Sequence, residues 1–139
     1  MDYYEIFEFA AAYAIDVPPD LDSVERSPST IFDLDEPMPG VLVGRFGAHA
    51  VTREFAQELR GYRFTGFRFG NASARVSEYS DRGDISIPEL ELLIVYGTPM
   101  VDDFSVNEWG DLVVSQRVFD VLVTRDQFVL EGSSKIGSR

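Results

Sequence analysis

The sequence predicts an α+β domain with a mostly antiparallel sheet and two short helices, and three observations lead to this fold class. Segments with the pattern of strands outnumber segments with helical spacing. Each of the two helix-like segments is short and follows a turn, a pattern typical of α+β folds. The chain has 139 residues, of which 45% are hydrophobic, so residues 1–139 can form a single domain around one core.

The N-terminal part is expected to contain two strands separated by a long loop. Residues 2–9 (DYYEIFEF) alternate well enough for an edge strand. Residues 16–39 contain five of the seven prolines together with many acids, which predicts an acidic loop with room for one short strand around Thr30–Leu34. Residues 40–46 (GVLVGRF) follow as the second strand.

The first helix is expected over residues 51–60 (VTREFAQELR). Its apolar residues recur at helical spacing, namely Val51, Phe55 and Leu59. Thr52 or His49 can serve as the N-terminal cap, because short polar side chains accept hydrogen bonds from the free N–H groups of the first turn. Gly61 stands where the helix should stop.

Three strands should follow the first helix. Residues 62–69 (YRFTGFRF) alternate strongly and predict a strand with a kink or bulge at Thr65 and Gly66. Residues 73–79 and 89–96 predict the next two strands. The second of these, ELELLIVY, is the most hydrophobic run of the chain, and we expect it to be the central strand of the sheet.

The C-terminal part predicts a short strand, the second helix and one last strand. Leu112–Val114 form the strand and Ser115 caps the helix that follows. The apolar face of that helix consists of Val118, Phe119 and Leu122. Residues 127–130 are expected to form the last strand, and residues 132–139 (GSSKIGSR) a frayed tail.

The charge balance indicates a class of partner. The net charge is −12, and ten of the 24 acidic residues lie within residues 1–40, where Arg26 is the only base. Such a field repels nucleic acids and anionic membranes and attracts a basic protein, although an excess of acids can also serve solubility alone.

No residues are predicted to be catalytic, to bind a cofactor or to bind a metal. The absence of cysteine excludes disulfides, thiolate zinc sites, iron–sulfur clusters and a cysteine nucleophile. His49 is the only histidine, and we expect it to be a helix cap or exposed to solvent. Phosphate-binding glycine motifs are missing, and Ser115 lacks the small neighbours of a nucleophile elbow.

The N-terminus does not look like a targeting segment. It has no basic stretch of a signal peptide, and no run approaches the roughly 18 apolar residues of a membrane span. The sequence therefore predicts a cytoplasmic protein.

Acidic residues recur beside aromatic ones, which suits a protein-binding surface in which aromatics anchor a partner and acids attract it. The predicted partner-binding residues are Asp33, Asp35, Glu36, Asp102, Asp103, Glu108, Trp109 and Asp111. Trp109, the only tryptophan, allows two readings. It can be an exposed anchor, or it can fold back as a lid on the core.

Four segments, in this order, carry a resemblance to a known group of families: YYEI, LRGYRFTGFRF, LELLIVYG and DDF…DLVVSQRVFDVL. The succession resembles bacterial immunity-protein families from polymorphic toxin loci, including the double-CxxCG family, over roughly residues 50–125. The two cysteine pairs of that family are absent here, so no metal site is carried over. The matching positions are architectural, namely Phe104, Leu112, Val113, Val114, Ser115 and Leu122. The resemblance implies a class of protein and supplies no binding site.

These observations together predict a binding protein without enzymatic activity, in particular an immunity protein that neutralises a toxin domain with a basic surface. An adaptor or assembly protein is the alternative within the binding class. A cofactor-free hydrolase that uses a pair of carboxylates is the alternative among enzymes.

Overall fold

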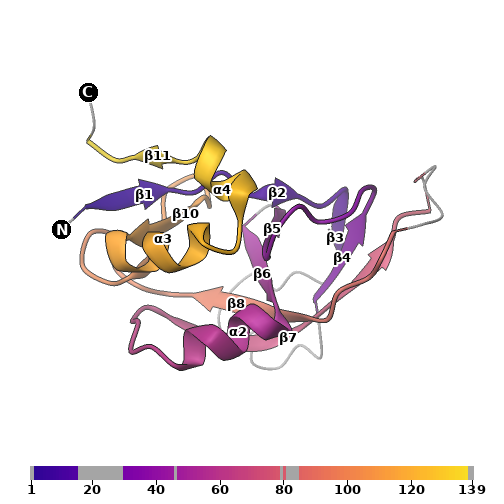
Figure 1. Ribbon diagram of the computed structural model, residues 1–139, viewed down its shortest axis with the longest axis horizontal. Coiled ribbons are helices and arrows are strands. Elements are labelled where there is room, and N and C mark those ends of the chain that lie inside the picture. Colours follow the sequence, from indigo (N-terminus) through magenta and orange to yellow (C-terminus); the bar gives the residue numbers. More distant parts are fainter. Residues whose placement is uncertain (1, 16–29, 46, 79, 81–84, 138–139) are drawn as a thin grey trace.

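A computed structural model describes residues 2–15, 30–45, 47–78, 80 and 85–137 (Figure 1). These residues form an α+β fold with a mostly antiparallel arrangement of strands, which confirms the predicted fold class. None of the helices in these parts of the chain has the length and apolar character needed to cross a bilayer.

The strands form two sheets. The larger sheet has the order β2 (Phe9–Ala10), β5 (Leu42–Arg45), β6 (Ala48–Thr52), β8 (Leu90–Val95), β7 (Phe67–Val76), β4 (Thr30–Leu34) and β3 (Tyr13–Ile15). The smaller sheet has the order β11 (Ser134–Lys135), β1 (Tyr3–Glu5), β10 (Leu112–Ser115) and β9 (Phe104–Val106). Only the pairs β2–β5 and β4–β7 are parallel among these strands. The predicted central strand is confirmed, because β8 occupies the middle of the larger sheet.

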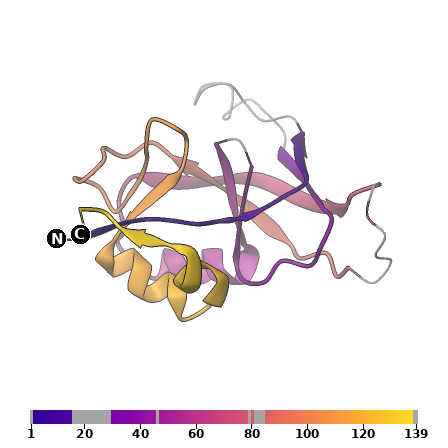
Figure 2. The same ribbon diagram turned by 90° about the horizontal axis from the view of Figure 1, so that it is seen from above.

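Three helices lie in the described residues, α2 (Arg53–Arg60), α3 (Gln116–Val123) and α4 (Gln127–Gly132). Helix α2 packs against β6 and β8, and α3 packs against β1, β10 and α4. Figure 2 shows all three helices on one side of the sheets, with the loop between β9 and β10 on the other side.

The larger sheet is buried on both faces at its centre. Leu42 and Val51 belong to the core cluster beneath the helices, which also contains the apolar residues of α2 and α3. Val43 and Ala50, their neighbours in sequence, belong to a second cluster on the opposite face. Burial on both faces explains why β8 reads as a continuous apolar run instead of an alternating one.

Both predicted helix caps are confirmed. The hydroxyl of Thr52 accepts a hydrogen bond from the N–H of Phe55 (3.3 Å), and Gly61 follows the last turn of α2. The hydroxyl of Ser115 accepts from the N–H of Val118 (3.4 Å) and caps α3, whose apolar face is buried as expected.

The predicted strand over residues 127–130 is wrong, because these residues belong to α4. The run Phe128–Leu130 is too short for its apolar pattern to distinguish a strand from a helix. The preceding Asp126 settles the conformation, since its carboxylate caps α4 by accepting from the N–H of Val129 (3.1 Å). The same carboxylate accepts from the N–H groups of Val41 (2.8 Å) and Leu42 (3.2 Å), and so joins α4 to the start of β5.

The expected frayed tail contains strand β11, which pairs with β1 in the smaller sheet. The N–H of Ile136 donates to the carbonyl of Tyr3 (2.8 Å) just beyond the paired residues. Figure 1 shows the two strands side by side. These backbone hydrogen bonds hold the segment up to Ile136 against β1 despite its polar composition, and residues 138 and 139 lie outside the described residues.

Two further boundaries differ from the prediction. The expected strand over residues 2–9 is divided between β1 and β2, which belong to different sheets. The expected strand over residues 62–69 begins only at Phe67, after the predicted kink, and continues through Val76. Of the expected acidic loop, residues 16–29 lie outside the described residues, whereas Thr30–Leu34 form strand β4, as the sequence suggested.

Replacing Asp126 with alanine should lower the free energy of unfolding by about 3 kcal/mol, because three backbone N–H groups lose their acceptor in a buried place. Urea denaturation measures the change. Asp120→Ala is the matched control, since among the described residues this exposed carboxylate accepts a hydrogen bond only from the Gln116 side chain, and its loss should cost no more than about 0.5 kcal/mol. Equal losses in the two variants would contradict the role assigned to Asp126.

Candidate binding cleft

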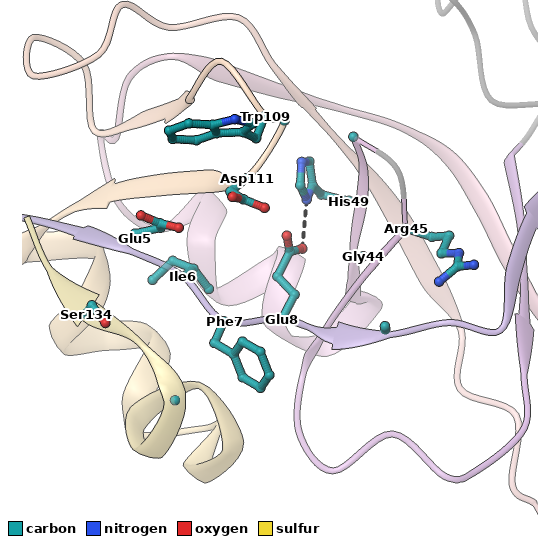
Figure 3. A pocket seen from close by; sticks show the side chains of 14 residues that line it. Glu5, Ile6, Phe7, Glu8, Gly44, Arg45, His49, Trp109, Asp111 and Ser134 are labelled. Atoms are coloured by element: carbon teal, nitrogen blue, oxygen red, sulfur yellow. Dashed lines mark hydrogen bonds and ion pairs between the residues drawn. The ribbon is translucent and has the colours of Figure 1, made fainter.

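A cleft of about 540 Å³ lies where four segments of the chain meet: the end of β1 with the residues that follow it, the hairpin of β5 and β6, the loop between β9 and β10, and the junction of α4 and β11. Its lining contains three carboxylates, those of Glu5, Glu8 and Asp111. Figure 3 shows these side chains gathered beneath the indole of Trp109, which forms part of the rim. The cleft therefore combines negative charge with an aromatic surface.

Trp109 is 75% exposed, which excludes the reading in which it folds back as a lid on the core. Its loop is nevertheless well ordered by Asn107, whose side-chain oxygen accepts from the N–H groups of Trp109 (3.0 Å) and Asp111 (2.9 Å). The N–H of Gly110 donates to the carbonyl of Asn107 (3.0 Å). Gly110 has a φ of +83°, a conformation that favours glycine. A firmly held loop thus presents a large apolar side chain to solvent.

A buried pair of titratable groups lies behind the rim. The Nδ1 atom of His49 lies 2.7 Å from Oε2 of Glu8, and the two side chains are only 3% and 11% exposed. His49 lies on β6 directly opposite Gly44 of β5. A Cβ atom at Gly44 would come within 2.5 Å of the Glu8 carboxylate, so glycine is needed there for Glu8 to reach His49.

The surroundings of His49 act on its pKa in opposite directions. Burial lowers the pKa, whereas the charge of Glu8 and its hydrogen bond raise it, and the Gly110 backbone and the Asp111 charge add to the rise. The net effect is a pKa above the usual value. Nε2 is buried and forms no hydrogen bond of regular geometry with any described residue, so the Gly110 carbonyl acts as a nearby dipole rather than as a formed hydrogen-bond acceptor.

The expectation that His49 caps a helix or faces solvent is therefore wrong. Its place in β6 was missed because Ala48–Thr52 precede the helix without a turn and were in part assigned to it. Glu5 and Glu8 were missed as well. The available signal was a histidine between two alanines in a segment without Gly or Pro, which is compatible with a buried strand position.

Three of the predicted partner-binding residues lie in the loop of the cleft. Trp109 and Asp111 line the cleft, and Glu108 is exposed beside them. Asp102 lies outside the lining and accepts a hydrogen bond from the N–H of Thr98 (2.7 Å) in the preceding turn.

Asp103 has a structural role that accounts for its charge. It is 5% exposed and accepts hydrogen bonds from the N–H of Thr65 (3.0 Å), the hydroxyl of Ser115 (2.7 Å) and the guanidinium of Arg117 (2.8 Å). Burial raises the pKa of Asp103, but the hydrogen bonds and the charge of Arg117 outweigh it and lower the pKa overall. We therefore remove Asp103 from the predicted partner surface.

The predicted residues near β4 lie elsewhere. Asp33 is 8% exposed and forms an ion pair with Arg75 (Oδ1 to Nε, 2.5 Å), so it too serves the fold. Asp35 and Glu36 are exposed and line a smaller hollow of about 240 Å³ with Phe9, Ala10 and Ala12. The eight predicted residues therefore do not form one surface.

The residues of the cleft suit a cationic group better than other ligands. Carboxylates attract ammonium or guanidinium groups, and the face of an indole adds a cation–π interaction. Within the described ranges, no group of three or more His, Asp and Glu side chains is arranged to hold a metal ion. An anionic ligand would meet the carboxylates of Glu5, Glu8 and Asp111.

Comparison with known proteins yields no relationship. No protein-family model matches the chain, and no curated protein or solved structure matches it closely enough to indicate kinship. The resemblance to immunity-protein families stays a prediction.

The raised pKa of His49 predicts a pH dependence of stability. In the unfolded chain the pKa is about 6.5, and in the folded protein it is higher, so the folded state binds the proton more tightly. This stabilisation is complete below the unfolded pKa and disappears as the pH rises through the folded one. The free energy of unfolding of the wild type, relative to His49→Gln, should therefore fall as the pH rises above about 6.5. Urea denaturation at a series of pH values measures it. A relative stability that rises with pH would contradict the raised pKa.

Proposed function

We propose that the protein acts by binding a basic protein partner through the cleft and the loop that carries Trp109. More specifically, we propose that it is a bacterial immunity protein that neutralises a cognate toxin domain in the cytoplasm. The observation that carries the proposal is an exposed tryptophan on an ordered loop at the rim of a carboxylate-lined cleft.

Trp109 has the properties of an interface anchor. Tryptophan is enriched among the residues that contribute most to the binding energy of protein interfaces. The hydrogen bonds of Asn107 already fix the backbone of the loop, so the loop loses little conformational entropy when a partner binds to it. An exposed indole with no packing role among the described core clusters leaves binding as the best explanation of its position.

The charge of the protein fits the same partner class. The net charge of −12 attracts a basic surface at long range, and the carboxylates of Glu5, Glu8 and Asp111 offer positions for lysine or arginine side chains in the cleft. Toxin domains that act on nucleic acids need a basic surface because their substrate is a polyanion. The resemblance of residues 50–125 to immunity-protein families supports the same class.

The pair of Glu8 and His49 raises an enzymatic alternative. A carboxylate that orients Nδ1 of a histidine leaves Nε2 to act as a general base, as in hydrolytic triads. In this protein Nε2 is buried and faces the backbone of the loop, so a substrate atom cannot reach it without a movement of that loop. No hydroxyl among the described residues donates to it. Binding is therefore the function that the geometry favours.

The test uses the product of a toxin-like reading frame next to the gene of this protein, with calorimetry to measure its affinity. Trp109→Ala should weaken binding by about 2 kcal/mol, or roughly 30-fold, because the anchor is lost. It should leave the free energy of unfolding nearly unchanged, since the side chain is exposed.

Tyr96→Ala is the matched control, because this tyrosine is another exposed aromatic residue, 51% exposed, and does not line the cleft. It should leave the affinity unaltered. A Trp109→Ala protein that binds the toxin with wild-type affinity would refute the proposed site, and a neighbouring toxin that does not bind the wild type would refute the proposed function.

Charge reversal tests the electrostatic part separately. Changing Glu108 and Asp111 to lysine should slow association with the same toxin, and the effect should shrink as the salt concentration rises. Stopped-flow fluorescence measures the association rate. An equal effect at low and high salt would show that these carboxylates do not attract the partner by long-range charge.

A further inference from the structure

The only histidine and the only tryptophan of the chain belong to two segments that touch each other. His49 follows the turn of the β5–β6 hairpin, and Trp109 stands in the loop between β9 and β10. The loop approaches the hairpin closely, since a Cβ atom at Gly110 would lie 3.5 Å from the Cα of Gly47. Figure 3 shows the ring of His49 between Glu8 on one side and the loop of Trp109 on the other.

The two nitrogen atoms of His49 have different surroundings. Nδ1 lies 2.7 Å from the Glu8 carboxylate and therefore carries a proton in either charge state of the ring. Nε2 is buried beside the Gly110 backbone. When the ring is neutral, the lone pair of Nε2 has no donor among the described residues. The Gly110 backbone favours the protonated ring. A backbone group can do so only through its carbonyl oxygen, which is itself an acceptor. When the ring is protonated, Nε2 becomes a donor toward that carbonyl.

We propose that His49 is a proton-operated latch on the loop of Trp109. Protonation lets Nε2–H attract the Gly110 carbonyl and holds the loop against the β5–β6 hairpin. Deprotonation replaces this attraction with two facing acceptors and loosens the contact. The position of the exposed indole at the rim of the cleft therefore depends on the charge of a histidine buried behind it.

The other charged groups around His49 act in the same direction. Glu8 comes from the segment between β1 and β2, and Asp111 from the loop itself, and both favour the protonated ring. Glu5 of β1 adds a third carboxylate to the cleft. On β5, Arg45 is the only base in the lining, and Figure 3 shows its guanidinium turned away from His49. Each charge that faces the ring is negative, so the closed loop is the form favoured at lower pH.

This latch would regulate the site of the proposed function, and it rests on that proposal for its biological meaning. Its physical test needs no partner. A protein that binds no basic partner could still show the latch, and a protein without the latch could still bind, so the two proposals fail independently.

The test follows both residues in one pH titration from about 5.5 to about 9, the range in which histidine is expected to titrate. The NMR signal of the single histidine reports its protonation. Fluorescence anisotropy of the single tryptophan and its quenching by acrylamide report the mobility and exposure of the loop. In the wild type, anisotropy should fall and quenching should rise as the pH increases. The midpoint of this change should coincide with the midpoint of the histidine titration.

Two variants identify the groups responsible. His49→Gln should remove the transition of the tryptophan signal. Glu8→Gln should shift both midpoints to lower pH by about one unit or more, because the ring loses its neighbouring charge. Glu131→Gln, an exposed glutamate on α4 outside the cleft, is the matched control and should leave both midpoints in place.

The outcomes are decisive in either direction. A wild-type histidine that titrates while the tryptophan signal stays constant would overturn the latch, as would a tryptophan transition that persists in His49→Gln. If circular dichroism shows that a variant does not fold, the wild type alone tests the proposal. Equal midpoints of the histidine and tryptophan signals support the latch, and different midpoints contradict it.

Discussion

The buried carboxylate of Asp103 is the interaction on which the geometry of the loop depends. It receives hydrogen bonds from Thr65, Ser115 and Arg117, which belong to the segment after α2 and to the junction of β10 and α3. The hydroxyl of Ser115 donates to Asp103 while it caps α3, so one side chain fixes both the helix and the carboxylate. Because Asp103 immediately precedes β9, this network sets the base of the hairpin that carries Trp109.

The acidity of the chain therefore has two separate uses. Asp33, Asp103 and Asp126 are buried and accept hydrogen bonds from guanidinium, hydroxyl or backbone groups, so they hold the fold together. Glu5, Glu8, Glu108 and Asp111 gather at or beside the cleft, where they can act on a partner or on His49. Net charge alone could not separate these groups, since a carboxylate contributes the same amount to the net charge whether or not it is paired within the fold.

Local signals made much of the fold predictable. Thr52 and Ser115 could be identified as caps because a cap depends on residues within one turn, and β8 could be placed at the centre because its apolar run is long. The pair of Glu8 and His49 could not be predicted, since it joins residues 41 positions apart and depends on which residue of β5 lies opposite His49. Trp109 and Asp111 were found because acids recur beside aromatic residues in the sequence, but the cleft that gives them a context arises only from the tertiary structure.

The most direct test of the binding cleft is an NMR titration of the ¹⁵N-labelled protein with an oligo-arginine peptide, at low and at high salt. The single indole N–H signal of Trp109 reports the rim, and the backbone signals of Glu8, Gly110 and Asp111 report the interior of the cleft. We expect these signals to shift together at low salt and to return toward their free positions at high salt, as cation binding by carboxylates requires. Shifts confined to Asp35 and Glu36, or no shift of the indole signal at all, would contradict the cleft as the site for a basic partner.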